Sequence, residues 1–346
     1  MLYIHQTSCI SSQQTFENTD LEEVHEAVNN KLLAIEPVYE NIPPSMLRRM
    51  GKAVRISIGA AIPLLRGLVA PDGIIIGSGN GGMEDCIKFL NQIIDFDEGM
   101  LTPGHFVQST ANAMASQISL LTRNNSYNMT HVHLGLAFEN ALLDALMQNM
   151  ENPSATFLVG GVDEISSSNY NIEFQDGWYK KEPLSNKDLY TSQSAGSLAG
   201  EGTAMFLVSG SPRNALARFK SVFLLHTNDQ QAVSTQLRKF ISDKLGEDEV
   251  DLLLSGENGD DRLTPVYAAC ESIFGPHTTI ARYKHMTGEF PTGTAIASWL
   301  GCQFLQGHPI PGHMIKRKGR SEQLENMLIY NNYKGKQHSF VLLSKV

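Results

Sequence analysis

Cysteine is scarce in this chain of 346 residues, which contains four in all. They are Cys9, Cys86, Cys270 and Cys302, and no two of them form a C-x-x-C pair. Such wide spacing argues against a disulfide framework and against a zinc site, because both need clustered cysteines. We expect free thiols, mostly buried, in a reducing cytoplasm.

The chain also lacks an excess of positive charge and a long apolar run. It has 27 Lys and Arg against 36 Asp and Glu, a formal net charge of −9. Non-specific nucleic-acid binding needs a basic surface, so this composition excludes it. No apolar run reaches the roughly 18 residues of a membrane-spanning helix, and the N-terminus does not resemble a signal peptide. We therefore expect a cytoplasmic protein that binds neither membranes nor nucleic acids.

Apolar runs typical of strands alternate with helical patterns along the chain, and 42% of the residues are hydrophobic. The expected strands are 2–10, 73–77, 130–133, 156–162, 204–208, 219–225, 250–254, 278–283, 327–331 and 339–343. The expected helices are 44–65, 83–94, 110–122, 136–150, 230–245, 264–274 and 294–305. Residues 11–41 and 169–199 are interpreted as long excursions. The alternation predicts an α/β protein with helices on both faces of its sheets.

The best candidate for a boundary is the sequence Gly-Ser-Pro-Arg-Asn at 210–214. It separates two stretches, 1–212 and 213–346, in which strands and helices follow each other in a similar order. We interpret the chain as two pseudo-duplicated halves. Stacking the two halves would give a five-layer arrangement.

A glycine-rich sequence, Gly-Ser-Gly-Asn-Gly-Gly, occupies residues 77–82 between an expected strand and an expected helix. It fits the G-x-G-x-x-G pattern of a dinucleotide-binding loop, and Asp95 and Asp97 follow at about the expected distance. The loop nevertheless comes after earlier elements, and both Asp residues fall in a polar loop. A tight turn that allows close packing is the simpler interpretation.

Six segments of the chain occur in a characteristic order. They are Arg-Arg-Met at 48–50, the glycine-rich turn at 77–82, Phe-Val-Gln-Ser-Thr-Ala-Asn at 106–112, Thr-Phe-Leu-Val-Gly-Gly-Val-Asp-Glu at 156–164, Gly-Glu-Gly-Thr-Ala at 200–204 and Lys-His-Met-Thr-Gly-Glu at 284–289. Together they resemble β-ketoacyl-acyl-carrier-protein synthases, from about Pro44 to the C-terminus. The resemblance implies an α/β, thiolase-like five-layer αβαβα fold built from two pseudo-duplicated halves.

In that family a Cys at a strand-to-helix turn accepts the acyl group, and two His help to decarboxylate the extender unit. The stretch Asn-Met-Thr-His-Val-His-Leu-Gly-Leu-Ala-Phe-Glu-Asn-Ala-Leu at 128–142 aligns to this turn without gaps. The alignment places Gly135 at the Cys position. The first His position falls on Gly256, with Glu257 as the alternative register.

The second His position and the oxyanion loop are altered as well. Glu289 stands at the second His position, whereas Lys284 and Thr287 of the same motif are retained as residues with a residual role. The loop that the family builds from Gly-Phe-Gly-Gly-Thr-Asn reads Tyr-Lys-Gly-Lys-Gln-His at 333–338. Only Gly335 is a remnant of its glycines.

These changes imply a catalytically degenerate subunit, because acyl transfer needs a nucleophile that Gly135 does not supply. By resemblance the chain is similar to chain-length-factor subunits and to ketosynthase-like subunits of aryl-polyene or flexirubin-type pathways. Such a subunit pairs with an active β-ketoacyl synthase, shapes its acyl tunnel and meets its acyl carrier protein. We expect no cofactor and no metal, and pairing with itself when the chain is produced alone.

Two other kinds of function stay open. One is an active enzyme of the same fold, a malonyl decarboxylase or an acyl hydrolase or transferase, built on His133, Lys284 and Glu289. The other is a nucleotide-dependent oxidoreductase that uses the glycine-rich turn. Lys284 and Glu289 are also the right pair of charges for a buried ion pair that fills the vacated site.

His131 and His133 would face the same side of a strand, which is how some metal sites begin. With Glu139 and Glu289 nearby, a metal-dependent hydrolase is an alternative, although no H-E-x-x-H motif or third paired ligand appears. Structural histidines with hydrogen-bonded rings are the simpler interpretation. The sequence leaves both open.

Two helices are candidates for contacts with other proteins. Arg48, Lys52 and Arg55 would share one face of the helix at 44–65, where they could receive an acidic carrier protein or partner. A solvated or locally paired face is the alternative interpretation. The helix at 110–122 is rich in small residues, which suits either a subunit interface or packing inside one subunit. Met114 and Leu120 on this helix are candidates for contact with an acyl tunnel.

Overall fold

The computed structural model describes residues 1–346 apart from Asn41, Leu68 and Glu322. The strands are β1 (Leu2–Ile10), β2 (Lys31–Leu32), β3 (Gly73–Ser78), β4 (Tyr127–Val132), β5 (Thr156–Asp163), β6 (Ala199–Gly200), β7 (Gly202–Ser209), β8 (Ala217–His226), β9 (Leu252–Ser255), β10 (Thr279–Arg282), β11 (Ile315–Arg317), β12 (Asn326–Tyr333) and β13 (Gln337–Ser344). The α-helices are α1 (Pro44–Leu47), α2 (Lys52–Leu65), α3 (Met83–Asp95), α4 (Pro103–Gln108), α5 (Ala113–Thr122), α6 (Ala137–Glu151), α7 (Ser167–Gln175), α8 (Gln230–Leu245), α9 (Thr264–Glu271), α10 (Lys284–Thr287) and α11 (Gly293–Leu305). Short 3₁₀ turns are η1 (Leu134–Leu136), η2 (Asn186–Asp188) and η3 (Gly312–Met314).

One large sheet runs through the molecule in the order β11-β10-β9-β12-β13-β8-β1-β7-β5-β3-β4. Strands β1, β7, β5, β3 and β4 come from the first part of the chain, and the other six come from the second part. The two sets meet where β1 pairs antiparallel with β8. Each set of neighbouring strands thus comes from one half of the chain. The boundary between the halves at residue 212 stays a prediction.

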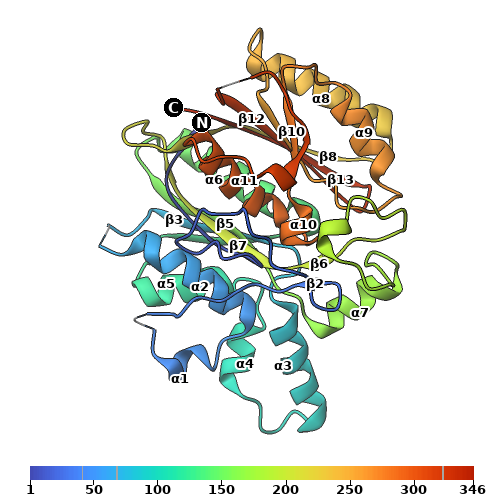
Figure 1. The fold of residues 1–346 in the computed structure, drawn as a ribbon. Coiled ribbons are helices and arrows are strands. Elements are labelled where there is room, and N and C mark those ends of the chain that lie inside the picture. The colour runs from blue at the N-terminus through green and yellow to red at the C-terminus, as the bar shows by residue number, and fades with distance from the viewer. Residues whose placement is uncertain (41, 68, 322) are drawn as a thin grey trace.

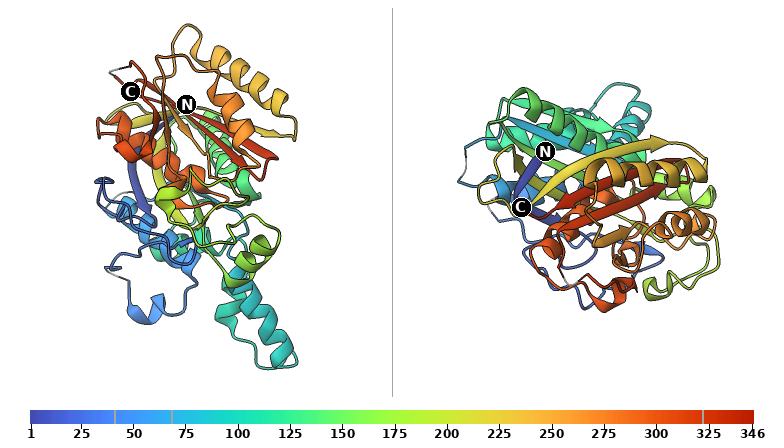
Figure 2. Two further views of the ribbon diagram at one scale, coloured as in Figure 1. Left: turned by 45° about the vertical axis from the view of Figure 1, so that its right-hand side comes forward. Right: turned by 90° about the horizontal axis from the view of Figure 1, so that it is seen from above.

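Three layers of helices enclose the two sets of strands (Figures 1 and 2). Helices α2 and α5 pack with the outer face of the first set. Helices α6 and α11 share one apolar cluster with strands of both sets, and α8 and α9 pack against the outer face of the second set. The order helix, sheet, helix, sheet, helix confirms the five-layer αβαβα fold.

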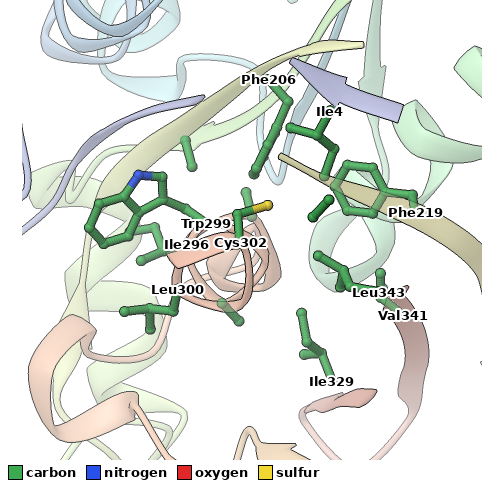
Figure 3. Close-up of a cluster of buried hydrophobic side chains, with 14 of the residues drawn as sticks. Ile4, Phe206, Phe219, Ile296, Trp299, Leu300, Cys302, Ile329, Val341 and Leu343 are labelled. Atoms are coloured by element: carbon green, nitrogen blue, oxygen red, sulfur yellow. The ribbon is translucent and has the colours of Figure 1, made fainter. Parts of the chain in front are cut away.

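Helix α11 of the central layer is buried along its whole length. Its sequence Gly-Thr-Ala-Ile-Ala-Ser-Trp-Leu-Gly-Cys-Gln-Phe-Leu carries no charged side chain. Figure 3 shows Trp299, Leu300 and Cys302 of this helix among side chains from strands of both halves, such as Phe206 and Leu343. A helix that is apolar on all sides is stable only between two other layers.

The expected helix at 44–65 is wrong, because the chain forms α1 and α2 there instead. Gly51 precedes α2, and a Cβ at this position would lie 1.8 Å from Asp85 Oδ2. Arg48 ends α1 and so cannot share a helix face with Lys52 and Arg55.

The basic face expected on that helix is wrong for a second reason. Lys52 forms an ion pair with the buried Glu201, and Arg55 binds Glu36 with a distance of 2.6 Å between Nη2 and Oε1. Both cations are therefore neutralised within the chain. The interpretation as a locally paired face is the correct one for these two residues.

Helix α5 uses its small residues for packing inside the subunit. Ala113 and Ala115 are buried against the cluster that α2 and α5 share. Met114 is fully buried in the same cluster, and its contact with an acyl tunnel stays a prediction. Leu120 is exposed and can still meet another protein.

The four thiols are free, with Cys9, Cys270 and Cys302 buried and Cys86 half-buried. Burial raises the pKa of the Cys9 thiol to about 12 and that of Cys270 to about 11. These two groups stay protonated and unreactive. In the part of the chain that the structure describes, no helix is both long and apolar enough to cross a membrane.

Candidate functional site

Gly135 lies in the turn that connects β4 to α6. The strand ends at Val132, η1 covers Leu134–Leu136, and α6 follows at once. Leu134 has a φ of 48°, in the left-handed region that a branched side chain rarely adopts. The chain thus makes a sharp strand-to-helix turn that contains a glycine, while the match of Gly135 to the family's Cys stays a prediction.

The space next to Gly135 is filled by Tyr333, at the end of β12. A Cβ built on Gly135 would lie 2.2 Å from Tyr333 Cβ and 2.5 Å from Tyr333 Cγ. Burial raises the pKa of the Tyr333 phenol, as do the nearby Glu173 and Glu289, so this side chain is a neutral filler. A cysteine at position 135 and a tyrosine at position 333 cannot both occupy this conformation.

The backbone N–H of Gly135 is also occupied. It donates a hydrogen bond of 2.9 Å to Oε1 of Gln337, the first residue of β13. In a ketosynthase-type site this N–H is the group that would stabilise an oxyanion. The β12–β13 hairpin therefore covers both the turn at Gly135 and this N–H group.

Lys284 and Glu289 form the buried ion pair that the sequence suggested. Lys284 Nζ lies 2.9 Å from Glu289 Oε1, and the exposed fractions of the two side chains are 0% and 10%. Asn258 Nδ2 donates to the other carboxylate oxygen, Oε2, at 2.8 Å. The carboxylate of Glu289 is thus held from two sides.

Two glycines bring the motifs at 200–204 and 284–289 into backbone contact. The N–H of Gly200 donates to the carbonyl of Glu289 at 3.0 Å, and the N–H of Glu289 donates to the carbonyl of Leu198 at 2.7 Å. A Cβ at Gly200 would lie 2.0 Å from the carbonyl oxygen of Thr287. Gly288 has a φ of 71° and faces Ala199 with equally little room.

The first His position follows β9 directly. The N–H of Gly256 donates to the carbonyl of Tyr330, and a Cβ there would lie 2.5 Å from Asn331 Oδ1. Glu257 points elsewhere, to Arg282 and Lys316. The match of Gly256 to the family's His stays a prediction, while Asn258 is the residue of this loop that reaches Glu289.

Glu139 adds a second carboxyl group near Lys284. It is fully buried in the first turn of α6, and its Oε1 accepts a hydrogen bond of 2.6 Å from Ser339. Its Oε2 has no hydrogen-bond partner among the described residues. Burial raises the pKa of Glu139, whereas the charge of Lys284 acts in the opposite direction.

The remaining site residues predicted from the sequence lie apart from the ion pair. Thr287 is buried and donates to the carbonyl of Gly288, and Gly335, with a φ of 68°, turns the β12–β13 hairpin. His133 lies beyond the end of β4 and is exposed, so it does not alternate with His131 on a strand as expected. His131 instead binds Asp144, at 2.9 Å between Nε2 and Oδ2. These groups are not brought together as metal ligands.

The glycine-rich turn at 77–82 is a packing device. Its Gly79 N–H and Ser78 hydroxyl bind the buried carboxylate of Asp163, which also binds the N–H and hydroxyl of Thr292 before α11. Burial raises the pKa of Asp163 to about 6, and these four donors partly offset the effect. A Cβ at Gly79 would lie 2.4 Å from Pro291. Backbone N–H groups of the turn are thus already hydrogen-bonded within the chain.

The sequence comparison agrees with this geometry. Residues 23–208, more than half of the chain, match the family model described as beta-ketoacyl synthase, N-terminal domain. A comparison with curated protein sequences found no match.

Solved structures similar to the chain include the ishigamide ketosynthase/chain length factor, at 14% identity and a TM-score of 0.77, covering 100% of this chain and 99% of the other. A type II polyketide synthase acyl-carrier protein in complex with its ketosynthase bound to the hexaketide (AntDE:AntF) is also similar. Its identity is 13% and its TM-score is 0.77, and the match covers 100% of this chain and 99% of the other. The third is the ketosynthase ApeO in complex with its chain length factor ApeC from Xenorhabdus doucetiae. Its identity is 12% and its TM-score is 0.74, and the match covers 100% of this chain and 98% of the other. At these identities the likeness shows the thiolase-like fold.

Proposed function

The chain belongs to the β-ketoacyl synthase family, and from this premise we propose that it is a non-catalytic subunit that pairs with an active ketosynthase and shapes its acyl tunnel. The observation that carries the proposal is the turn at Gly135. This position has no nucleophile, and Tyr333 and Gln337 occupy the surrounding space and the N–H. Without a covalent acyl intermediate, the acyl transfer of a ketosynthase cannot take place.

The second half of the site supports the same proposal. Glu289 cannot replace a neutral His, because its carboxylate is bound by the ammonium of Lys284 and the amide of Asn258. A negative charge there would also repel the enolate that forms on decarboxylation. The buried pair fills the space instead of serving a reaction.

A surface for the partner is present at the edge of the sheet. Strand β4 is the last strand of the sheet, and its outer edge pairs with no strand of the described chain. Val132 on this strand is 45% exposed, and Leu120 of the adjacent α5 is 67% exposed. An apolar edge strand is a surface that proteins cover with another chain.

The helices α3 and α4 extend this surface. They project from the body of the molecule (Figures 1 and 2), and Asp85 is the one residue of the two that is buried. Ile94 is 75% exposed and Phe106 is 58% exposed. The side chain of Asn112, after α4, binds Asn128 and Thr130 of β4, so the projection and the edge strand are joined.

Two of the similar structures contain, by their descriptions, a chain length factor. By analogy, the partner of this chain is an active β-ketoacyl synthase of a polyketide or aryl-polyene type pathway. The acyl carrier protein would then serve that partner. When produced alone, the chain would pair with itself through the same edge.

The alternative enzyme of the same fold has less support. No hydrogen bond joins His133 to Lys284 or Glu289 in the described part of the chain, and Tyr333 closes the space above Gly135. The oxidoreductase alternative loses its phosphate-binding donors, since Asp163 and Ser78 already bind N–H groups of the glycine-rich turn.

Mass spectrometry tests the loss of ketosynthase chemistry. The protein alone is incubated with an acyl and a malonyl carrier protein, digested, and searched for acyl adducts on residues 128–142. We expect no adduct in this segment and no release of carbon dioxide. An acyl group on it, or carbon dioxide released by the protein alone, would overturn the proposal.

A further inference from the structure

A lysine and two serines meet on the excursion that follows α7. Lys180 is 2% exposed, and its Nζ lies 3.0 Å from both Ser192 Oγ and Ser194 Oγ. The two hydroxyl groups lie 3.0 Å from each other. Ser194 is exposed and Ser192 is half-buried, so the cluster reaches from the interior to the surface.

Two backbone carbonyls accept hydrogen bonds from the Lys180 amine. Its Nζ donates to the carbonyl of Ser194 at 2.7 Å and to the carbonyl of Gly259 at 2.8 Å. A neutral amine has two N–H groups and one lone pair. With both N–H groups on carbonyls, the lone pair is left for a serine hydroxyl.

No carboxylate of the described residues forms an ion pair with the Lys180 amine. Burial lowers the pKa of Lys180, and Arg262 lowers it too, whereas Asp260 and Asp261 raise it. Asp260 is itself bound by Arg262, and no carboxylate of the described residues lies within ion-pair distance of Lys180 Nζ. Buried lysines of this kind act as general bases in proteins.

The backbone N–H groups of Ser194 and Ala195 find no acceptor within the described residues. In its protonated form Lys180 would have a third N–H, which a serine hydroxyl accepts. The cluster also has an accessible hydroxyl, a second hydroxyl behind it and unoccupied N–H groups.

We propose that Ser194 is a nucleophile that Lys180 activates, and that the cluster hydrolyses small activated esters and thioesters. Ser194 Oγ attacks the carbonyl carbon while its proton passes to Lys180 Nζ. The bond to the leaving alcohol or thiol then breaks, and the leaving group takes that proton. Water, deprotonated by the same amine, attacks the acyl-serine, and the carboxylic acid and free Ser194 are released.

Ser192 is a positioning residue in this scheme, because it acts through its hydrogen bond to Ser194. The activity is separate from the turn at Gly135 and does not depend on a ketosynthase partner. An acyl group on Ser194 and one on residues 128–142 lie in different stretches of the sequence. Failure of this inference and failure of the proposed function are therefore distinguishable.

The test uses the full chain with p-nitrophenyl acetate and a fluorophosphonate probe. We expect the probe to label Ser194, as mapped by mass spectrometry, and Ser194→Ala to reduce hydrolysis to the background rate. Lys180→Arg keeps the donors to the carbonyls but loses the base, and should lower kcat about 100-fold. Ser192→Ala should change the pH profile of kcat and leave KM unchanged.

The matched control is Ser272→Ala, an exposed serine at the end of α9. It should label and hydrolyse like the wild type. If Lys180→Arg fails to fold in a thermal melt, the labelling of Ser194 and the loss in Ser194→Ala still decide the matter. Equal labelling of the wild type and Ser194→Ala, or a folded wild type that the probe does not label at Ser194, would overturn the proposal.

Discussion

At the scale of single residues, the contact between Gly135 and Tyr333 explains why the site cannot be repaired by one substitution. In Gly135→Cys the new side chain would overlap Tyr333, and overpacking of this kind costs about 1–3 kcal/mol. We expect a lower midpoint of denaturant unfolding and no acylation. In Gly135→Cys with Tyr333→Gly, which removes both the Cβ and the Cγ of Tyr333, the overlap is relieved and the loss of stability relative to Tyr333→Gly alone should be small.

A matched control is Gly104→Cys, since a Cβ at Gly104 meets nothing within 4 Å. It should change the free energy of unfolding by about 0.5 kcal/mol or less, apart from the effect of replacing glycine in a helix. If Gly135→Cys is as stable as this control, Tyr333 does not fill the nucleophile's place.

The Lys284–Glu289 pair makes a second prediction. Removing one partner leaves the other charge buried, so Lys284→Met should cost about 3–5 kcal/mol in the free energy of unfolding. The double variant Lys284→Met/Glu289→Leu removes both charges and should recover much of that loss. Urea denaturation of the three proteins checks this. A Lys284→Met protein as stable as the wild type would contradict the buried pair.

Two buried histidines predict how stability depends on pH. Burial lowers the pKa of His285 to about 3, with smaller effects of His313 and Arg282, and lowers that of His338 to about 4. Both pKa values lie below the unfolded value of about 6.5, so the unfolded chain binds more protons at mildly acidic pH. Stability from these groups is present above about pH 6.5 and is lost as the pH falls towards 3.

We expect the free energy of unfolding to fall by about 2–4 kcal/mol between pH 7 and pH 5 from these two groups. His285→Asn should remove roughly half of this pH dependence, whatever it does to stability at pH 7. The control is His308→Asn, since His308 is exposed. Identical pH slopes for the wild type and His285→Asn would show that His285 is not held neutral.

Sequence reasoning named Gly135, Lys284 and Glu289 but not the residues that fill the space around Gly135. Gly135, Lys284 and Glu289 could be located because each sits in a local motif. Tyr333 and Gln337 come from a hairpin some 200 positions further on, and the pairing across that distance depends on the β12–β13 register. The one available signal was the loss of the glycines at 333–338, which implied that side chains enter that space.

At the scale of elements, strand β4 is the sheet edge at which we propose that the partner binds. Val132→Glu would place a charge on its exposed apolar surface, and we expect affinity for the ketosynthase partner to fall at least about tenfold. The thermal midpoint should not change, because Val132 is 45% exposed in the monomer. Size-exclusion chromatography and titration of the partner check the prediction.

The control for this prediction is Ile172→Glu on α7, at an apolar residue outside the edge that is 64% exposed. It should leave binding unchanged. If Val132→Glu binds the partner as well as Ile172→Glu does, the interface lies elsewhere.

The elements that sequence predicts well are those whose local signals agree. Helix α8 spans the expected 230–245, because Asp229 caps its first turn with hydrogen bonds to the N–H groups of Gln231 and Ala232. The break between α1 and α2 escaped prediction, since the local pattern at 44–65 is helical throughout. Gly51, at the start of α2, lies where a Cβ would meet Asp85, and no local pattern contains this long-range contact.

At the scale of the whole molecule, both halves of the chain contribute to one closed site. The first half brings the turn at Gly135 and the second brings Glu289 and the β12–β13 hairpin, and the buried layer of α6 and α11 holds them together. The fold could be predicted because alternating elements and family motifs agree along the chain. The pairing with another subunit could not be predicted in the same way, because it depends on the surface of a second chain that this sequence does not contain.

The central claim is that the chain works by pairing with an active ketosynthase and not by its own acyl transfer. The most direct measurement is the chain-length distribution of the products when that ketosynthase is expressed with this chain, with its Val132→Glu variant and without it. The account predicts a stable complex and a defined product length that is lost in both other cases. No complex, together with the same product lengths in all three cases, would contradict it.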